Sequence, residues 1–200
     1  MITIQSIFHS KSGLVFQRSK PKKNASGKEY RALSLKAFAG QSKLNPIGQS
    51  TDVQDFVEMD PKYMTQVNDV VVRLRTPIQA LIVEDDGIGI VVPSHVVILR
   101  LKEGQESAID PKYFVHYFNS PSVQNRLEHQ SKGSSMISMI QIKTLSEYKL
   151  PAFPPIEEQR KVVELMEMLE EEQQLQKRLL ELSEKKRKAI MQHLFQSTNK

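Results

Sequence analysis

The residue types that most often carry catalysis are too scattered in this sequence to form a recognisable active site. There is no Gly-x-x-x-x-Gly-Lys phosphate loop, no Gly-x-Gly-x-x-Gly fingerprint and no Gly-x-Ser-x-Gly nucleophile elbow. Cysteine is absent, which excludes thiolate zinc sites and cysteine nucleophiles. No two histidines stand at metal-ligand spacing; they are His9, His95, His116, His129 and His193. We therefore predict no catalytic residue, no metal site and no cofactor.

Two short segments could still suggest chemistry on nucleic acid. The acidic run at 84–86 could supply metal ligands of a nuclease, but Gly87 behind it indicates a hairpin turn, and no clear Glu-x-Lys follows on a predicted strand. The Asn-Pro-Ile-Gly at 45–48 is similar to the Asn-Pro-Pro-aromatic motif of amino-methyltransferases. It lacks the aromatic residue that would stack on a flipped base, and no glycine-rich cofactor loop precedes it. The chain is therefore not expected to catalyse either reaction by itself.

The basic residues are better candidates for binding, because they are concentrated near the N-terminus. Residues 1–45 contain nine lysines and arginines and a single acid, Glu29, in a chain whose net charge is +5. Such a segment attracts polyanions, and the release of counterions makes that attraction sensitive to salt. A solvated, flexible basic stretch would have the same composition, so charge alone leaves both interpretations open.

The elements that must position these residues divide into two parts. Up to residue 153, runs rich in β-branched residues predict strands at 30–36, 69–75, 78–83, 87–92 and 95–102. Asp110-Pro111 and Ser120-Pro121 each predict the start of a helix. The Asp-Pro-Lys-Tyr at 60–63 recurs at 110–113, which we interpret as two helix or turn starts with the same chemistry. We expect an α+β globule with a mixed or antiparallel sheet and a few short helices.

From about residue 154 to residue 195 the sequence predicts one long helix, uninterrupted by glycine or proline after its Pro-Pro start. About 40 residues at ~1.5 Å each give a rod of ~60 Å, longer than the globule it leaves. Its apolar stripe has heptad spacing and consists of Leu165, Met168, Leu175, Leu179, Leu182 and Ala189. Glu172 and Lys186 interrupt the stripe, as polar residues do where a coiled coil fixes its register. We predict coiled-coil packing in preference to a helix lying on its own globule.

A second apolar stripe on the helix indicates more than one neighbour, and it consists of Val162, Met166, Leu169 and Ile190. No apolar run approaches the roughly 20 residues needed to cross a bilayer. The first ten residues lack the basic and apolar regions of a secretory signal. Since the absence of cysteine fits a reducing cytosol, we predict a cytoplasmic protein that does not bind membranes.

Three motifs, in their order and spacing, resemble the specificity subunit of type I restriction–modification enzymes, over about residues 28–195. The most specific is Leu-Pro-Ala-Phe-Pro-Pro-Ile-Glu-Glu-Gln at 150–159, similar to the family's strand end and Pro-Pro-x-x-Glu-Gln helix start. Gly133-Ser134-Ser135 resembles the family's Gly-Ser/Thr turn before the final strand. Val-Asn-Asp at 67–69 resembles its Gly-Asp strand start, with asparagine in place of glycine, a change that left-handed backbone geometry tolerates.

The resemblance implies a non-catalytic DNA-reading subunit of a prokaryotic enzyme complex. Residues 1–153 would be a target recognition domain that reads double-stranded DNA mainly through the major groove. Residues 154–200 would be a conserved helix that docks methyltransferase subunits, with restriction subunits as further partners. Complete subunits carry two such domains and two antiparallel helices, so this chain resembles half a subunit. Two copies are expected to pair their helices antiparallel and to read a palindromic, interrupted site; the alternative is pairing with another specificity chain.

The predicted DNA contacts follow from charge, turn geometry and this layout. Arg73 and Arg75 alternate with apolar residues, so both project from one face of a strand, where an arginine fork can reach guanine O6 and N7. The lysines lie in turn-rich segments suited to phosphate contacts, and two serines follow a glycine that lets the backbone approach phosphate. The full set is Lys20, Lys22, Lys23, Lys28, Arg31, Arg73, Arg75, Lys132, Ser134 and Ser135.

Two other classes of function stay open on the sequence alone. A coiled-coil interaction protein whose basic globule binds an acidic protein would keep its partners after nuclease treatment. A stand-alone nuclease would cleave DNA in a metal-dependent reaction that charge-neutral changes at 84–86 abolish.

Overall fold

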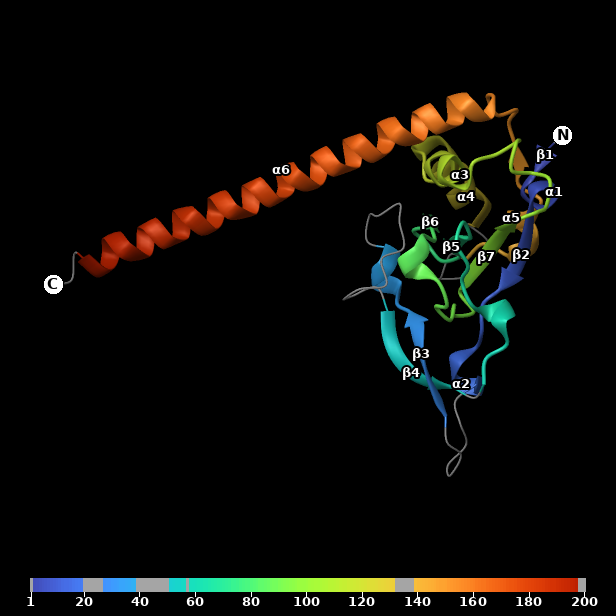
Figure 1. Cartoon of the computed structure of the whole chain (residues 1–200), viewed down its shortest axis with the longest axis horizontal. Coiled ribbons are helices and arrows are strands. Elements are labelled where there is room, and N and C mark those ends of the chain that lie inside the picture. The colour runs from blue at the N-terminus through green and yellow to red at the C-terminus, as the bar shows by residue number, and fades with distance from the viewer. Residues whose placement is uncertain (1, 20–26, 39–50, 57, 132–138, 198–200) are drawn as a thin grey trace. The chain divides into compact units, whose positions relative to one another are not determined.

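The structure is a computed structural model that describes residues 2–19, 27–38, 51–56, 58–131 and 139–197 (Figure 1). The chain divides into two compact units, Met1–Arg160 and Lys161–Lys200. Among the described residues, no helix is both long and apolar enough to span a membrane. The same residues contain no cluster of three or more histidine or acidic side chains that could share a metal ion.

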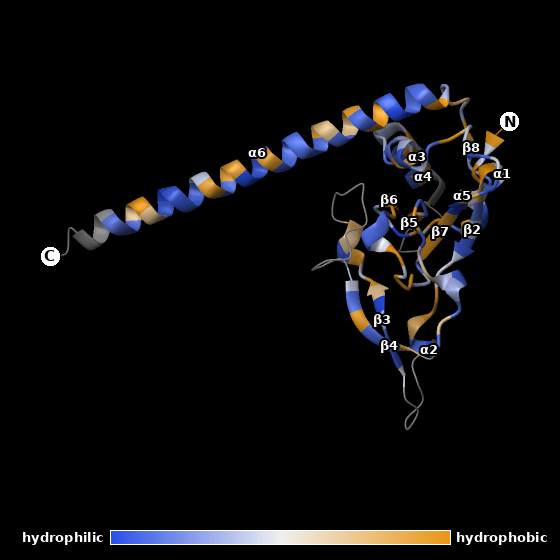
Figure 2. Cartoon of the chain, in the orientation of Figure 1, coloured by the Kyte–Doolittle hydropathy of each residue, from blue (hydrophilic) through white to orange (hydrophobic). Residues whose placement is uncertain are grey.

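A four-stranded antiparallel sheet with the order β2-β7-β5-β6 forms the centre of the first unit. Its strands are β2 (Phe8–Ser12), β5 (Val70–Arg73), β6 (Gln79–Ile82) and β7 (Val96–Leu101). Along β5, Val70 and Val72 belong to one hydrophobic cluster and Val71 to another, and all three are fully buried. The sheet therefore separates two cores, which is why its inner strands are almost continuously apolar (Figure 2).

Short helices cover one face of the sheet. The cluster on this face includes residues of α1 (Ile4–Ile7), α3 (Pro111–Phe118), α4 (Pro121–Ser131) and α5 (Ile142–Ser146). Phe114 and Phe118 of α3 are fully buried there, and the Phe114 ring lies 4.8 Å from that of Phe8. Two short strands, β1 (Ile2–Thr3) and β8 (Lys149–Leu150), pair antiparallel at the start and end of this unit.

The other face of the sheet is covered by a two-stranded ribbon and the segment that follows its first strand. The ribbon consists of β3 (Lys28–Leu33) and β4 (Thr51–Phe56), which pair antiparallel. Leu33 and the 3-10 helix η1 (Leu35–Phe38) complete the second cluster, in which Phe38 is buried. A third, smaller cluster joins the ribbon to Val91, and Phe16 of the short helix α2 (Phe16–Ser19) packs against it.

Both Asp-Pro-Lys-Tyr segments begin helices, as predicted. Asp110 caps α3, because its Oδ1 accepts hydrogen bonds from the backbone N–H of Lys112 at 2.8 Å and of Tyr113 at 3.2 Å. Asp60 caps the 3-10 helix η3 (Pro61–Tyr63) in the same way, accepting from the N–H of Lys62 at 2.9 Å. The repeat is thus a capping motif used twice.

Not every predicted strand was correct. The runs at 69–75, 78–83 and 95–102 became β5, β6 and β7, and the run at 30–36 overlaps β3. The strand predicted at 87–92 was wrong. Its start forms the 3-10 helix η4 (Asp85–Gly87) instead of a hairpin turn, and Gly89 has a φ of +76°, which interrupts extended backbone. Val91 makes only isolated bridges with Ala32 and Met64.

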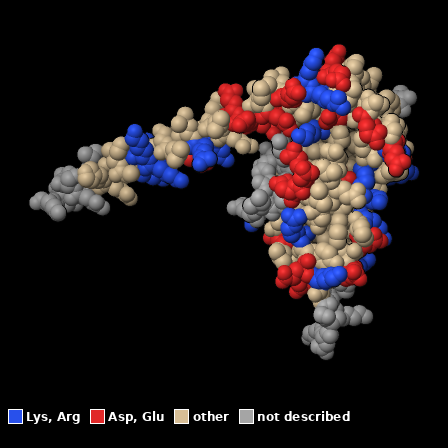
Figure 3. All heavy atoms as spheres, in the orientation of Figure 1, with Lys and Arg blue, Asp and Glu red and all other residues tan. Residues whose placement is uncertain are grey.

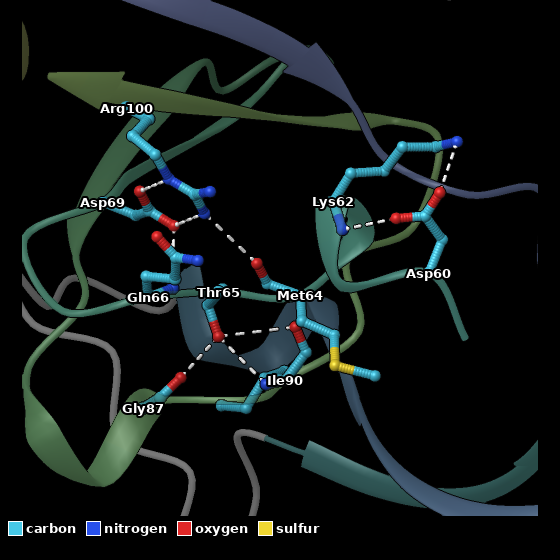
Figure 4. Close-up of polar contacts among 9 residues, drawn as sticks. All are labelled: Asp60, Lys62, Met64, Thr65, Gln66, Asp69, Gly87, Ile90 and Arg100. Atoms are coloured by element: carbon cyan, nitrogen blue, oxygen red, sulfur yellow. Dashed lines mark hydrogen bonds and ion pairs between the residues drawn. The ribbon is translucent and has the colours of Figure 1, made fainter. Parts of the chain in front are cut away.

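The start of β5 is held by an ion pair between a buried carboxylate and a partly exposed guanidinium (Figure 4). Asn68 adopts the left-handed conformation, with a φ of 65°, which the sequence allowed for at this position. The turn directs Asp69, which is 1% exposed, toward Arg100 of β7; Nε and Nη2 of Arg100 donate to the carboxylate at 2.8 and 2.7 Å. The hydrogen bonds that Arg100 donates to the Asp69 carboxylate raise the pKa of Arg100. This bidentate ion pair fixes the start of β5 and therefore helps to position its last residue, Arg73.

The helix α6 (Ile156–Ser197) is continuous, as predicted, and nearly all of the second unit belongs to it. The boundary between the compact units falls after Arg160, inside α6. The first turn of α6 is therefore part of the globular unit.

Candidate nucleic-acid interface

Six of the ten predicted DNA contacts lie outside the residues that the structure describes. They are Lys20, Lys22, Lys23, Lys132, Ser134 and Ser135. The other four, Lys28, Arg31, Arg73 and Arg75, have described positions, and they fall into two pairs on different strands.

Lys28 and Arg31 lie on β3, and both have partners within the chain. Lys28 Nζ donates to Glu58 Oε1 at 3.2 Å, a bond that raises the pKa of the exposed ammonium. The Arg31 guanidinium donates through Nη1 to the carbonyl of Asp86 at 3.2 Å and through Nη2 to that of Ile88 at 2.6 Å. Arg31 thus links the ribbon to η4 and to Ile88, the residue after it. Its charge alone does not indicate this structural role.

Arg73 is the last residue of β5, Arg75 lies two residues beyond it, and the two side chains differ in how they are held. Arg73 is partly buried; its Nε donates to the carbonyl of Pro77 at 2.8 Å, and its Cζ lies 5.4 Å from the centroid of the Phe38 ring. Burial lowers the pKa of Arg73 from its ordinary value, and an arginine stays charged after such a change. Arg75 is exposed, and its backbone forms an isolated bridge with Met139. The strand end therefore presents one fixed and one exposed guanidinium.

His95 completes this basic strand end, although its type and spacing in the sequence did not mark it. Its carbonyl accepts a hydrogen bond at 2.9 Å from the N–H of Leu74, the residue that stands between Arg73 and Arg75. Its Nε2 is buried and has no hydrogen-bond partner in the part of the chain that the structure describes. Burial first, and then the charges of Arg75 and Arg73, lower the pKa of the imidazole.

We expect the pKa of His95 to lie below its usual value of about 6.5 and to rise when Arg75 is replaced by alanine, because a nearby positive charge is removed. The unfolded chain binds more protons between the folded and unfolded pKa values, so stability is full above about pH 6.5 and falls as the pH drops through that window. Nuclear magnetic resonance titration of the imidazole measures the pKa of His95 in the wild-type chain and in Arg75→Ala.

Lys143→Ala is the control for that titration, since Lys143 is an exposed cation that does not contribute to the shift of His95. A His95 pKa that Arg75→Ala leaves unchanged would contradict the arrangement of charges at this strand end.

Outside this strand end, charges of both signs alternate over the face of the globular unit that Figure 3 shows. In the segment 84–86, Lys112 Nζ lies 2.8 Å from Glu84 Oε1, and Arg31 donates to the backbone carbonyl of Asp86. The excess of positive charge in residues 1–45 therefore does not by itself outline a binding face among the described residues.

The first turn of α6 is fixed by one buried amide. Gln159 is fully buried; its Oε1 accepts from the N–H of Asp110 at 2.9 Å, and its Nε2 donates to the carbonyls of Ala108 at 2.9 Å and Pro154 at 2.8 Å. The amide thereby links the start of α6 to the capping residue of α3. The last residue of the Pro-Pro-x-x-Glu-Gln motif thus has a structural reason to be glutamine.

The predicted partner stripe on α6 faces solvent in the single chain. Five of its residues are between 53% and 70% exposed, namely Leu165, Met168, Leu175, Leu179 and Leu182, and Ala189 is exposed as well. The second stripe is also exposed at Val162, Leu169 and Ile190. The charges of the helix are segregated: residues 161–176 carry five glutamates and one lysine, whereas residues 177–197 carry six lysines and arginines and two glutamates (Figure 3).

A family model described as the type I restriction modification DNA specificity domain matches residues 1–184, which include the basic strand end, Gln159 and most of α6. The chain belongs to this family. No curated protein matches the sequence.

Two solved members of type I restriction–modification systems share the fold of this specificity domain. One is a chain from a study of the complex assembly and conformational transition of a type I R-M system, with 17% identity and a TM-score of 0.56 over 86% of this chain and 38% of that one. The other is the HsdS subunit from Thermoanaerobacter tengcongensis, with 15% identity and a TM-score of 0.54 over 86% of this chain and 37% of that one. The specificity domain described here therefore spans less than two fifths of either chain's length.

The site of this family member contains residues that sequence patterns did not reveal. Phe38 and Pro77 contact Arg73, His95 is close enough to both arginines for their charges to lower its pKa, and the three residues come from separate segments of the chain. No pattern in a single sequence indicates that these three residues lie close together. The only available signal was the Thr76-Pro77 connection, which placed a turn next to β5.

Proposed function

We propose that this chain is the DNA-recognition subunit of a type I restriction–modification system, acting in the prokaryotic cytoplasm. It has no catalytic role of its own and directs methyltransferase subunits, and with them restriction subunits, to a bipartite site. The observation that carries the proposal is the family match over residues 1–184, which covers the globular unit and most of the long helix. The globular unit is the target recognition domain, and the helix is the surface for dimerisation and methyltransferase docking.

Arg73 is the base-reading residue in this proposal, and Arg75 contacts phosphate. A fixed guanidinium can present two parallel donors to guanine O6 and N7, which discriminates one base from the others. An exposed cation near the same strand end supplies attraction that does not depend on sequence. The lysines at 20–28 and the residues at 132–135 add phosphate contacts.

Selection from a pool of duplex DNA with a randomised window, bound by the purified full chain, tests the proposal. We expect defined bases to emerge, and Arg73→Ala to lose about 1–3 kcal/mol of discrimination at one position, roughly 5- to 150-fold. Lys22→Ala should instead weaken binding to all sequences and reduce the salt slope by about 1. Binding at physiological salt that is indifferent to sequence would refute the recognition role.

The segregated charges of α6 support an antiparallel homodimer. When two copies of residues 161–197 pair antiparallel, the acidic half of each lies along the basic half of the other; parallel pairing places like charges together. A twofold axis near Lys177 sets Leu175 against Leu179 of the second copy. In this register Glu172 lies within about one helical turn of Lys186 of the second copy, so the two polar interruptions of the stripe neutralise each other.

Introduced thiols test the orientation, because the natural chain has no cysteine. The proposed register brings Leu165 of one copy against Ala189 of the other. A mixture of the Leu165→Cys and Ala189→Cys chains should therefore form a mixed disulfide under mild oxidation, whereas neither variant alone should cross-link. Efficient cross-linking of Ala189→Cys to itself would show parallel pairing and overturn the antiparallel model.

A further inference from the structure

The guanidinium of Arg73 is constrained on two sides. Its Nε–H is used by the Pro77 carbonyl, 2.8 Å away across the connection from β5 to β6. The ring of Phe38, itself only 4% exposed, lies under the guanidinium carbon at 5.4 Å. A planar cation stacked on an aromatic face and hydrogen-bonded through Nε has little freedom to rotate about its last torsions.

Neither of these two contacts uses the terminal nitrogens of the guanidinium. Nη1 and Nη2 have no hydrogen-bond partner among the residues that the structure describes, and Arg73 makes no ion pair there. The two terminal nitrogens can donate hydrogen bonds to a planar ligand edge that carries two acceptors. The described contacts of Arg73 therefore hold it without using the groups needed for recognition.

Arg75 provides the internal comparison. It lies two residues further along the chain, is exposed, and has no side-chain partner among the described residues. Each rotamer-rich side chain that binding must immobilise costs about 0.5–1.5 kcal/mol, which corresponds to roughly 2- to 12-fold in affinity. Arg75 has to lose this freedom on binding, whereas Arg73 has already lost most of it in the free protein.

We infer that Phe38 is a specificity-determining residue, which acts by positioning Arg73: its ring and the Pro77 carbonyl hold the guanidinium in the orientation that reads a base. Phe38 reaches this place because η1 follows β3 and packs into the second hydrophobic cluster, on the face of β5 that continues from Val71 to Arg73. The inference rests on the proposed function, since it names the residue that makes base reading selective.

The positioning itself is measurable without DNA. In full-length chain labelled with ¹⁵N-arginine, the Arg73 Nε–H should give a protected, rigid signal. Phe38→Leu should make that signal mobile and should leave the Arg75 signal unchanged. Phe38→Tyr keeps the ring and should restore rigidity, and Ile98→Val is the control, because it trims the same hydrophobic cluster without touching the stack. An Arg73 signal that stays rigid in Phe38→Leu overturns the inference.

Selection from the randomised duplex pool then tests the role of Phe38 separately from the role of Arg73. Phe38→Leu should reduce discrimination at the position read by Arg73 by about 2- to 12-fold, with the salt slope unchanged, whereas Arg75→Ala should reduce the salt slope and keep the base preference. If Arg73→Ala relaxes the preference but Phe38→Leu does not, the inference fails and the proposed function stands. If Arg73→Ala has no effect on the preference, the assignment of Arg73 as base reader fails first.

Discussion

Leu175→Glu combined with Leu182→Glu is expected to convert a dimer of this chain into a monomer. Both leucines are more than half exposed in the single chain and lie on the heptad stripe, so their burial would come from a second helix. Burying a leucine side chain contributes about 1.5–3 kcal/mol. Since the twofold axis doubles every substitution, four leucines are lost, and the dissociation constant should rise by more than about 1,000-fold. Sedimentation over a concentration range measures the change.

Leu180→Glu is the matched control for that experiment. Leu180 is 62% exposed, the same fraction as Leu175, but it lies off the heptad stripe of the same helix. The same chemical change at this position should therefore leave the dimer intact. The globular unit should unfold at the wild-type temperature in all three chains, because none of these leucines belongs to its hydrophobic clusters. A double variant that remains dimeric would show that the stripe is not the interface.

The sequence predicted best those elements whose stability is decided locally. The valine runs of β5 and β7 are buried on both faces of the sheet, and the two Asp-Pro pairs cap the helices that follow them, so composition and capping chemistry were sufficient. The long helix needed only its uninterrupted helical sequence. The family resemblance, which rested mainly on the motif at 150–159, was confirmed by the family model.

Elements whose stability depends on distant partners were predicted poorly. β2, with the sequence Phe-His-Ser-Lys-Ser, has little β-strand character of its own, and it becomes a strand because it pairs along its full length with β7. β4 likewise depends on pairing with β3. The segment 87–92 is the opposite case, since its apolar residues enter the core without forming a ladder. Pairing across large sequence separations does not appear in local composition.

The candidate site shows the same division. The alternation at 72–75 predicted that Arg73 and Arg75 share a strand end, but the difference between them comes from Phe38 and Pro77, which only the tertiary fold brings close. Arg31 has the same charge and was given the same predicted role, yet its donors are used by two backbone carbonyls. Charge identifies residues able to bind DNA, whereas the hydrogen bonds within the chain decide how many donors remain for it.

Gln159→Leu is expected to lower the free energy of unfolding of the globular unit by about 2–3 kcal/mol, since three hydrogen bonds of roughly 1 kcal/mol each are lost. The midpoint of thermal unfolding should fall by roughly 5–10 °C for a unit of this size. The effect arises because the amide joins the segment before α3 to the first turn of α6 from a fully buried position. Calorimetry of the full chain measures it.

Gln173→Leu is the matched control, because Gln173 is an exposed glutamine of the same helix and its replacement should change stability by no more than about 0.5 kcal/mol. Gln159→Glu separates hydrogen bonding from packing, since it keeps the shape but turns an oxygen toward the carbonyls of Ala108 and Pro154. Repulsion and burial would raise the pKa of the new carboxyl above its unfolded value of about 4.3. The stability of Gln159→Glu should therefore fall as the pH rises above that value and recover in acid. The loss of stability in Gln159→Leu should be the same in acid and at neutral pH.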